Sequence, residues 1–250
     1  MAAVARGLCI LGVVVAIGCA LAGLGAGLGY RFGWWHYGAG IATLGNVFWV
    51  ALGTAVSCLL ALVLALVAAR PSPVLPASLA AAGLAIAGVT AWVPYDLRMT
   101  ANALPRIHDI STDLADPPAF VRAAELRAKG EHPVAYDGPE VAALQKKAYP
   151  DLVTLELKAP RDKVLLAASA ALVSMGLEIT ATDMAAGRIE AVATSRLFGF
   201  KDDVVVRVAP VPGGGARVDV RSMSRVGRHD FGANAERVRA LLARIRDRLA

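Results

Sequence analysis

Two polar segments outside the apolar amino-terminal part carry most of the residue types that could do chemistry. Residues 107–120 contain one histidine, one threonine and three aspartates, and the candidate site residues among them are His108, Asp109, Thr112 and Asp113. Residues 221–239 combine arginines with small polar side chains: Arg221, Ser222, Ser224, Arg225, Arg228, Asp230, Asn234 and Arg237. Because guanidinium groups bind carboxylates through paired hydrogen bonds, we expect the two segments to meet in one patch. The expected partners are the carboxylates Asp109, Asp113 and Asp116 and the arginines Arg221, Arg225 and Arg228.

A joined patch of this kind has two interpretations. Buried arginine–aspartate pairs can simply hold a long loop against the edge of a sheet. The same groups can instead bind a ligand, in which case the residues named above form a binding site. The sequence leaves both interpretations open.

A catalytic interpretation needs a nucleophile, a base and a group that orients the base. Ser222 or Ser224, with His108 or His229 and Asp109, supplies these residue types. No nucleophile-elbow motif surrounds either serine. We therefore assign no catalytic residue, and a membrane-tethered hydrolase remains the alternative function.

Thiol and metal chemistry receive little support from the sequence. The cysteines all lie in apolar stretches before residue 96: Cys9, Cys19 and Cys58. Residues 96–250 therefore contain no disulfide and no thiolate ligand. His108, Asp109 and Asp113 would offer a metal only one nitrogen ligand, without a characteristic spacing. We predict no metal and no cofactor.

Charge divides the chain into two parts. All 20 acidic residues follow Tyr95, whereas only Arg6, Arg31 and Arg70 of the 26 basic residues precede it. We therefore expect a membrane anchor of three helices over residues 1–95 and a soluble domain over residues 96–250. The soluble part has no basic run interleaved with aromatic residues, so nucleic acid is not an expected partner. Membrane lipids, and other membrane or envelope proteins, are the expected partners.

Three apolar runs are long enough to cross a membrane, which needs about 20 residues. They cover residues 8–28, about 41–69 and about 75–93, and Arg70 and Pro71 close the second run. A cleaved signal peptide competes for the first run, because Ala20-Leu21-Ala22 resembles a cleavage site. Placing Arg6 and Arg70 inside follows the positive-inside rule. This predicts a bacterial inner-membrane protein whose carboxyl-terminal domain is extracytoplasmic.

The soluble part alternates between strand and helix patterns. Residues 95–104 are interpreted as a polar lead-in, and residues 107–120 as a turn-rich loop. We expect helices over residues 138–148, between Pro160 and Gly176, and along the apolar stripe that ends the chain. Strands are expected at residues 152–157, 188–196, 204–208 and 217–221, with Ser222 and Ser224 continuing the inward face. Asp230 or Asn234 is expected to cap the last helix. The pattern predicts an α+β domain, an antiparallel sheet with helices on one face.

The two polar segments also resemble the signatures of an uncharacterised membrane-anchored family, catalogued as domain of unknown function number 1499. The first signature is similar to His108-Asp109-Ile110-Ser111-Thr112-Asp113 followed by Pro117, Pro118 and Phe120. The second is similar to Arg221, Ser222, Ser224, Arg225, Gly227, Arg228, Asp230, Gly232, Asn234 and Arg237. Ser111 stands where the family's pattern has threonine. The resemblance covers about residues 105–248 and implies no known activity.

Together these patterns predict an integral membrane protein of unknown biochemical activity. Its α+β domain is expected to act as a binding or scaffolding module at the membrane surface. The two polar segments would form either its functional surface or its brace.

Overall fold

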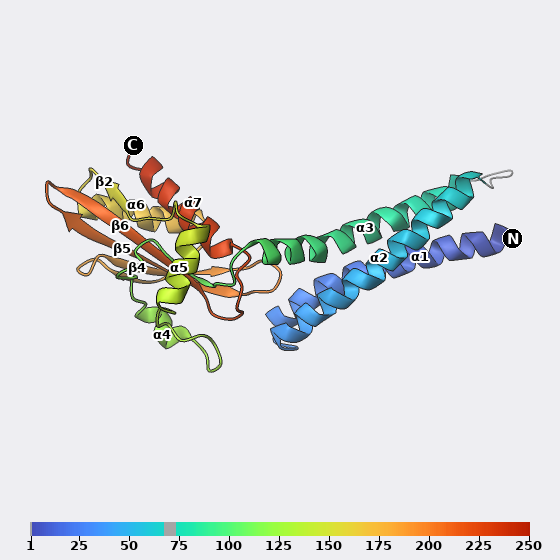
Figure 1. Cartoon of the computed structure of the whole chain (residues 1–250), viewed down its shortest axis with the longest axis horizontal. Coiled ribbons are helices and arrows are strands. Elements are labelled where there is room, and N and C mark those ends of the chain that lie inside the picture. The colour runs from blue at the N-terminus through green and yellow to red at the C-terminus, as the bar shows by residue number, and fades with distance from the viewer. Residues whose placement is uncertain (1, 68–73) are drawn as a thin grey trace. The chain divides into compact units, whose positions relative to one another are not determined.

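The computed structural model of the protein describes residues 2–67 and 74–250. The chain forms two units, one made of long helices and one built around a sheet (Figure 1). Each unit has its own packing.

The helical unit contains α1 (Ala2–Arg31), α2 (Tyr37–Val67) and α3 (Val74–Ala103). All three are long and apolar enough to cross a membrane by length and composition. Small residues let these helices approach closely, as in other membrane bundles: Ala16, Ala55 and Ala87 pack together as a buried cluster, one from each helix. The end of the second predicted span, with Arg70 and Pro71, lies outside the described residues.

Helix α3 is longer than the sequence suggests. The third span was expected to end before Pro94, with a polar lead-in after it, but Pro94 lies inside a helix that continues to Ala103. A proline removes one helical hydrogen bond without preventing the following turns. Leu97, Met99 and Ala101 favour helix and extend it. The expected boundary after residue 95 therefore falls within a continuous helix.

The second unit is an antiparallel sheet with helices, so the predicted α+β class is confirmed. Its strands are β1 (Asp109–Ser111), β2 (Leu155–Leu157), β3 (Glu178–Asp183), β4 (Arg188–Thr194), β5 (Lys201–Val211) and β6 (Gly215–Ser224). The order is β1-β6-β5-β4-β3, and β2 also pairs with β6. Strands β1 and β3 were not predicted. The first lies in a segment rich in turn-forming residues, and its three residues become a strand only by pairing with β6.

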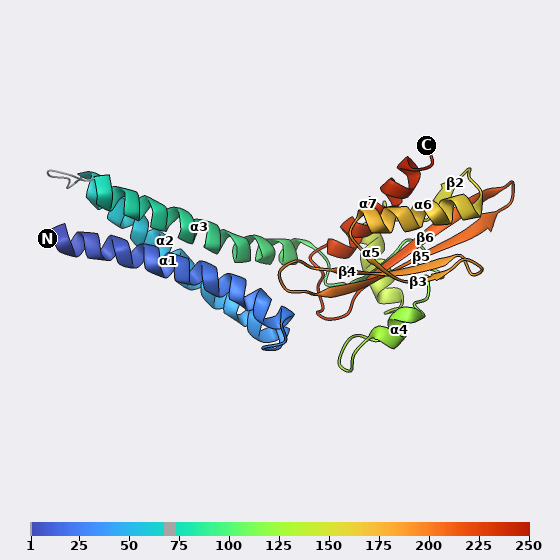
Figure 2. The same cartoon turned by 180° about the vertical axis from the view of Figure 1, so that it is seen from behind.

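One face of the sheet carries the main core. Helices α6 (Arg161–Ser174) and α7 (Ala233–Asp247) cover this face (Figure 2). Val204, Val206 and Val208 of β5 are buried there, as their spacing predicted. Val218 and Val220 of β6 join the same cluster. The helices therefore cover one face in the arrangement expected from the sequence.

The opposite face is covered by residues 112–137, which we call the strap. The strap contains the short helix α4 (Arg122–Leu126), on the side of the sheet away from α6 and α7 (Figure 2). Phe120 and Ala123 of the strap pack with Val205 and Met223 of the sheet. Helix α5 (Pro139–Ala148) follows the strap, in the place predicted for it. The strap converts the outward face of the strands into a second buried layer.

Candidate functional site

The two polar segments meet through Asp109 and Arg221. Strand β1 pairs with β6, which places Asp109 opposite Met223 and Ser111 opposite Arg221. Arg221 Nε and Nη2 donate to the Asp109 carboxylate over 2.9 and 2.7 Å. Both residues are almost fully buried. Burial raises the pKa of Asp109, and the hydrogen bonds from Arg221 act in the opposite direction.

The strap encloses this ion pair. Arg221 also donates to the carbonyl oxygens of Pro118 and Val134, over 3.3 and 3.0 Å. Its guanidinium carbon lies 4.8 Å from the ring centroid of Phe120 and 5.3 Å from that of Tyr136. Arginine is therefore held by a carboxylate, two carbonyls and two aromatic rings, which matches the planar donors of guanidinium.

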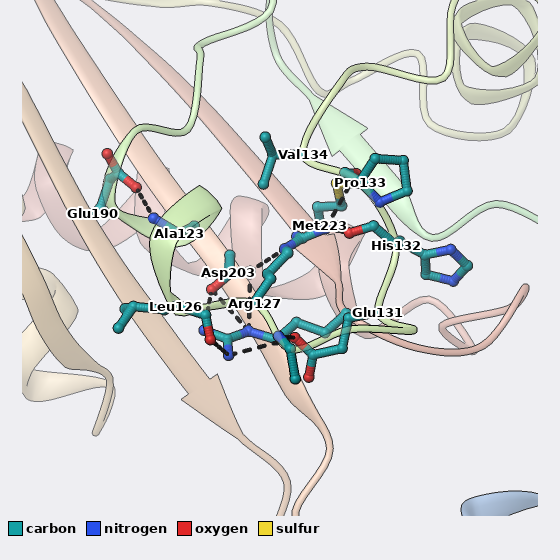
Figure 3. A network of polar contacts seen from close by, with 12 residues as sticks. Ala123, Leu126, Arg127, Glu131, His132, Pro133, Val134, Glu190, Asp203 and Met223 are labelled. Atoms are coloured by element: carbon teal, nitrogen blue, oxygen red, sulfur yellow. Dashed lines mark hydrogen bonds and ion pairs between the residues drawn. The ribbon is translucent and has the colours of Figure 1, made fainter.

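A second buried ion pair joins Arg225 to Asp203 of β5. Arg225 Nη2 donates to Asp203 Oδ1 over 2.7 Å, and Arg127 Nε of the strap donates to Oδ2 over 2.8 Å. Figure 3 shows Asp203 and Arg127 within the network that links the strap to β5. The prediction that Arg225 pairs with Asp109 or Asp113 is therefore wrong. Charge alone could not choose between carboxylates, and Asp203 lies closer on the neighbouring strand.

Asp113 pairs with different arginines from those expected. Its Oδ2 accepts from Arg207 Nη2 over 3.0 Å and from Arg217 Nη2 over 2.7 Å. The same two guanidinium groups bind Asp219, which is fully buried. Although burial opposes the shift, hydrogen bonds from the amides of Asp116 and Ala115 and the charge of Arg207 lower the pKa of Asp113.

Glu190 of β4 anchors the start of helix α4. Its Oε1 accepts from the backbone amides of Val121 and Arg122 over 2.9 and 3.0 Å, and Oε2 accepts from Ala123 over 2.9 Å. Figure 3 shows Glu190 beside Ala123. Free amides at a helix start need such acceptors. A single buried carboxylate therefore fixes the middle of the strap to the sheet.

The serines of β6 lie on the other face, against α7. Ser222 donates to Asn234 Oδ1 over 2.6 Å, and Arg237 Nη1 donates to both Ser222 Oγ and Asn234 Oδ1. Asn234 Nδ2 donates to Ser224 Oγ over 2.9 Å. Arg237 also binds Asp202 at 2.7 Å. The inward direction predicted for both serines is confirmed, and their hydroxyl groups hold the last helix to the strand.

The remaining predicted residues have separate positions. Thr112 accepts from the Val220 amide through its hydroxyl and donates its own amide to the Val220 carbonyl, so it continues the pairing of β1. Asp230 accepts from the amides of Gly232 and Asn234 over 2.9 and 3.0 Å, as predicted for a residue at the start of α7. Arg228 is exposed, and no ion pair forms on it among the described residues. The expectation that Arg228 joins the patch is wrong.

His108 stacks on His132 of the strap. Their ring centroids lie 4.1 Å apart, and His108 Nε2 is 3.6 Å from Asp137 Oδ2. Burial and the neighbouring His132 lower the pKa of His108. Within residues 2–67 and 74–250, no group of three or more histidine, cysteine, aspartate or glutamate side chains could hold a metal ion.

Several residues of this network were not predicted from sequence: Arg127, Glu190, Asp203, Arg207, Arg217 and Asp219. Arg127 belongs to the strap, and the other five lie on strands. The alternation of these five with valines and alanines marked a polar face of the strands, which would ordinarily face water. The strap covers that face, and each of these charges then needs a partner. The buried carboxylates of the network are paired on both oxygens, whereas Arg127 Nη2 and the Tyr136 hydroxyl are buried without a hydrogen-bond partner among the described residues. Paired carboxylates of this kind give the network the chemistry of a rigid support.

Comparison with known proteins agrees with the extent of this domain. The model of a family described as "Protein of unknown function (DUF1499)" matches residues 109–245, more than half of the chain. No curated protein matches the chain. One similar solved structure is the crystal structure of TTHA0849 from Thermus thermophilus, with 15% identity, 39% of this chain and 94% of that chain covered, and a TM-score of 0.25. A likeness at that score carries no argument about this chain.

Proposed function

The chain belongs to the DUF1499 family of proteins of unknown function, and from this premise we propose that its sheet domain is a binding or scaffolding module that three apolar helices hold at a membrane. Membrane lipids, or other membrane and envelope proteins, are its partners. Residues 107–120 and 221–239 act mainly as the brace of this module. The surface that meets the partner lies around the brace.

The observation that carries this proposal is the complete pairing of the buried carboxylates between strap and sheet. Asp109, Asp203 and Glu190 each have both carboxylate oxygens occupied by donors from the strap or from a neighbouring strand. Breaking such a buried pair leaves an uncompensated charge. Strap and sheet are therefore held as one rigid body, which suits a surface that binds a partner without reorganising.

The hydrolase alternative has no comparable support. Ser222 Oγ donates to Asn234 and accepts from Arg237, and the imidazole of His108 stacks on His132. A serine nucleophile needs a base within hydrogen-bond reach. We expect a fluorophosphonate probe to leave Ser222 and Ser224 unlabelled in the full chain. Covalent labelling of either serine would favour the hydrolase.

Co-purification tests the binding proposal. The full chain is purified in mild detergent beside a Glu190→Ala variant, and co-purifying proteins and lipids are identified by mass spectrometry. Glu190→Ala frees the strap but leaves the apolar helices unchanged. We expect at least one species to be retained by the native chain and lost from the variant. The same species in equal amounts on both would contradict a binding role for the sheet domain.

We also propose that the carboxyl-terminal domain is extracytoplasmic in a bacterial inner membrane. Support comes from the charges that flank the spans, since Arg6 and Arg70 would lie inside and Arg31 outside. Reporter fusions at Ala250 test the sidedness. A reporter that works only in the cytoplasm should be silent there, and its activity would reverse the proposed orientation.

A further inference from the structure

A gap in the edge of the sheet forms a groove. Strand β6 pairs with β1 at Arg221–Met223 and with β2 at Ala216–Val218. Thr112 continues the β1 pairing to Val220, so the gap between the two short partners lies at Asp219. Beside this gap is a groove of about 550 Å³, which we call the edge groove. Its volume falls within the range of about 300–1,000 Å³ that is typical of small-molecule sites.

Apolar side chains form much of the wall of the edge groove. Leu114, Tyr149, Leu152 and Val153 line it. Val153 is 59% exposed, although it is a large aliphatic residue. Water therefore covers apolar surface here that a hydrocarbon chain could cover instead.

The acidic groups at the edge groove have protein hydrogen-bond partners, whereas some of the basic groups do not. Asp113 and Asp219 have both oxygens occupied by protein donors. Arg217 binds these carboxylates through Nε and Nη2, which leaves its Nη1 free of acceptors among the described residues. Lys146 is exposed on the groove wall, and none of the described residues pairs with it. Apart from the buried Tyr149 hydroxyl, which also has no hydrogen-bond partner among the described residues, the groups named here without a protein acceptor are cationic donors.

We propose that the edge groove binds an anionic amphiphile, an apolar chain that ends in a carboxylate or a phosphate. The anionic head contacts Lys146 and Arg217 Nη1, and the chain lies against Leu152 and Val153. Charge-assisted hydrogen bonds hold the head. This inference rests on the proposed binding function and names a ligand class for it.

Photolabelling of the full chain tests the assignment. The protein is placed in phosphatidylcholine nanodiscs and labelled with a diazirine derivative of dodecanoic acid, and the labelled peptides are mapped by mass spectrometry. We expect adducts in residues 112–115 and 146–154. Dodecanoate or dodecyl phosphate should compete about tenfold better than dodecanol, since only the first two carry the anion. The relative strength of these two competitors distinguishes a carboxylate from a phosphate head.

Matched variants locate the site. Val153→Glu places a negative charge in the groove and should reduce its labelling about tenfold, because like charge repels the head. Lys146→Gln removes a cationic donor and should reduce labelling several-fold. Leu166→Glu is the control, because Leu166 lies on α6 away from the groove and is 63% exposed, close to the exposure of Val153. It should leave labelling unchanged.

Three results would overturn the edge-groove proposal: labelling of groove peptides no stronger than that of α6, equal competition by dodecanol, or equal labelling of the Val153→Glu variant. A chain that fails one of these tests but still retains its strap-dependent co-purifying species keeps the binding function and loses only the groove. If the groove is labelled but no strap-dependent species co-purifies, the edge-groove proposal stands and the strap-dependent binding function is lost.

Discussion

Asp109 and Arg221 are 112 residues apart in sequence and meet through two hydrogen bonds of 2.9 and 2.7 Å beneath the strap. Asp109 comes from the first strand of the sheet and Arg221 from the last. Their contact therefore links the first and the last strand of the sheet domain. This ion pair and the contacts that surround it lead to testable predictions.

Removing one member of the pair should destabilise the sheet domain strongly. Arg221→Met leaves the buried Asp109 carboxylate without its partner, which costs about 3–5 kcal/mol in comparable cases. Asp109→Asn combined with Arg221→Met should cost less than the sum of the single changes. The free energy of unfolding can be measured on the full chain by urea titration with pulse proteolysis.

A surface pair provides the control for that experiment. Arg122 and Glu125 form an exposed ion pair on α4, and Arg122→Ala should change the free energy of unfolding by less than about 1 kcal/mol. Equal losses from Arg221→Met and Arg122→Ala would show that the buried pair does not brace the domain.

Glu190 should control the opening of the strap. Glu190→Ala removes the acceptors of three amides at the start of α4, from Val121 to Ala123. Hydrogen exchange of residues 119–127 should accelerate, because local opening then exposes these amides. Glu125→Ala, an exposed change on the same helix, should leave exchange unaltered. Unchanged exchange in the Glu190→Ala chain would contradict the anchoring role.

Gln145 should be needed at the outer edge of β1. Its side-chain amide accepts from the Ser111 amide over 2.9 Å and donates to the Ser111 carbonyl over 2.6 Å. The Gln145 side chain therefore pairs the backbone groups of Ser111 that a further strand would otherwise pair. Gln145→Ala leaves both buried groups unpaired and should cost about 1–3 kcal/mol for each group. Lys147→Ala on the exposed side of α5 is the matched control. Equal midpoints in a urea titration would exclude this role.

His108 should make the sheet domain less stable in mild acid. Burial and His132 lower its pKa in the folded chain, against a weaker opposing influence of Asp137 and Asp230, and Arg127 adds to the lowering. The unfolded chain takes up a proton below about pH 6.5, where the folded chain does not. The contribution of neutral His108 to the free energy of unfolding is therefore fully present above that pH. It falls as the pH drops toward the pKa of His108 in the folded chain.

His108→Phe keeps a ring for stacking and removes the titration. The free energy of unfolding of the native chain should fall more between about pH 7.5 and pH 5.5 than that of this variant, since only the native chain has a proton to gain there. Parallel pH profiles for the two chains would show that His108 does not contribute.

The sequence determined the elements of this protein that depend on local pattern. Apolar length was enough to place three candidate spans, and the period of two was enough to put Val218 and Ser222 on the inward face of β6. It also determined the kind of partner each charge needs, because a buried guanidinium requires an acceptor. The expectation that Asp109 lies in one patch with arginines near the carboxyl end followed from that requirement.

Only the tertiary structure decided which charge meets which. Asp113 was expected near Arg225, yet it binds Arg207 and Arg217, while Arg225 binds Asp203. Carboxylates are interchangeable as partners by charge, and the register of β5 on β6 selects among them. The tertiary structure also determines which polar residues are buried, because the strap covers a strand face whose polar residues would otherwise face water. Burial by a distant segment leaves no local pattern in the sequence.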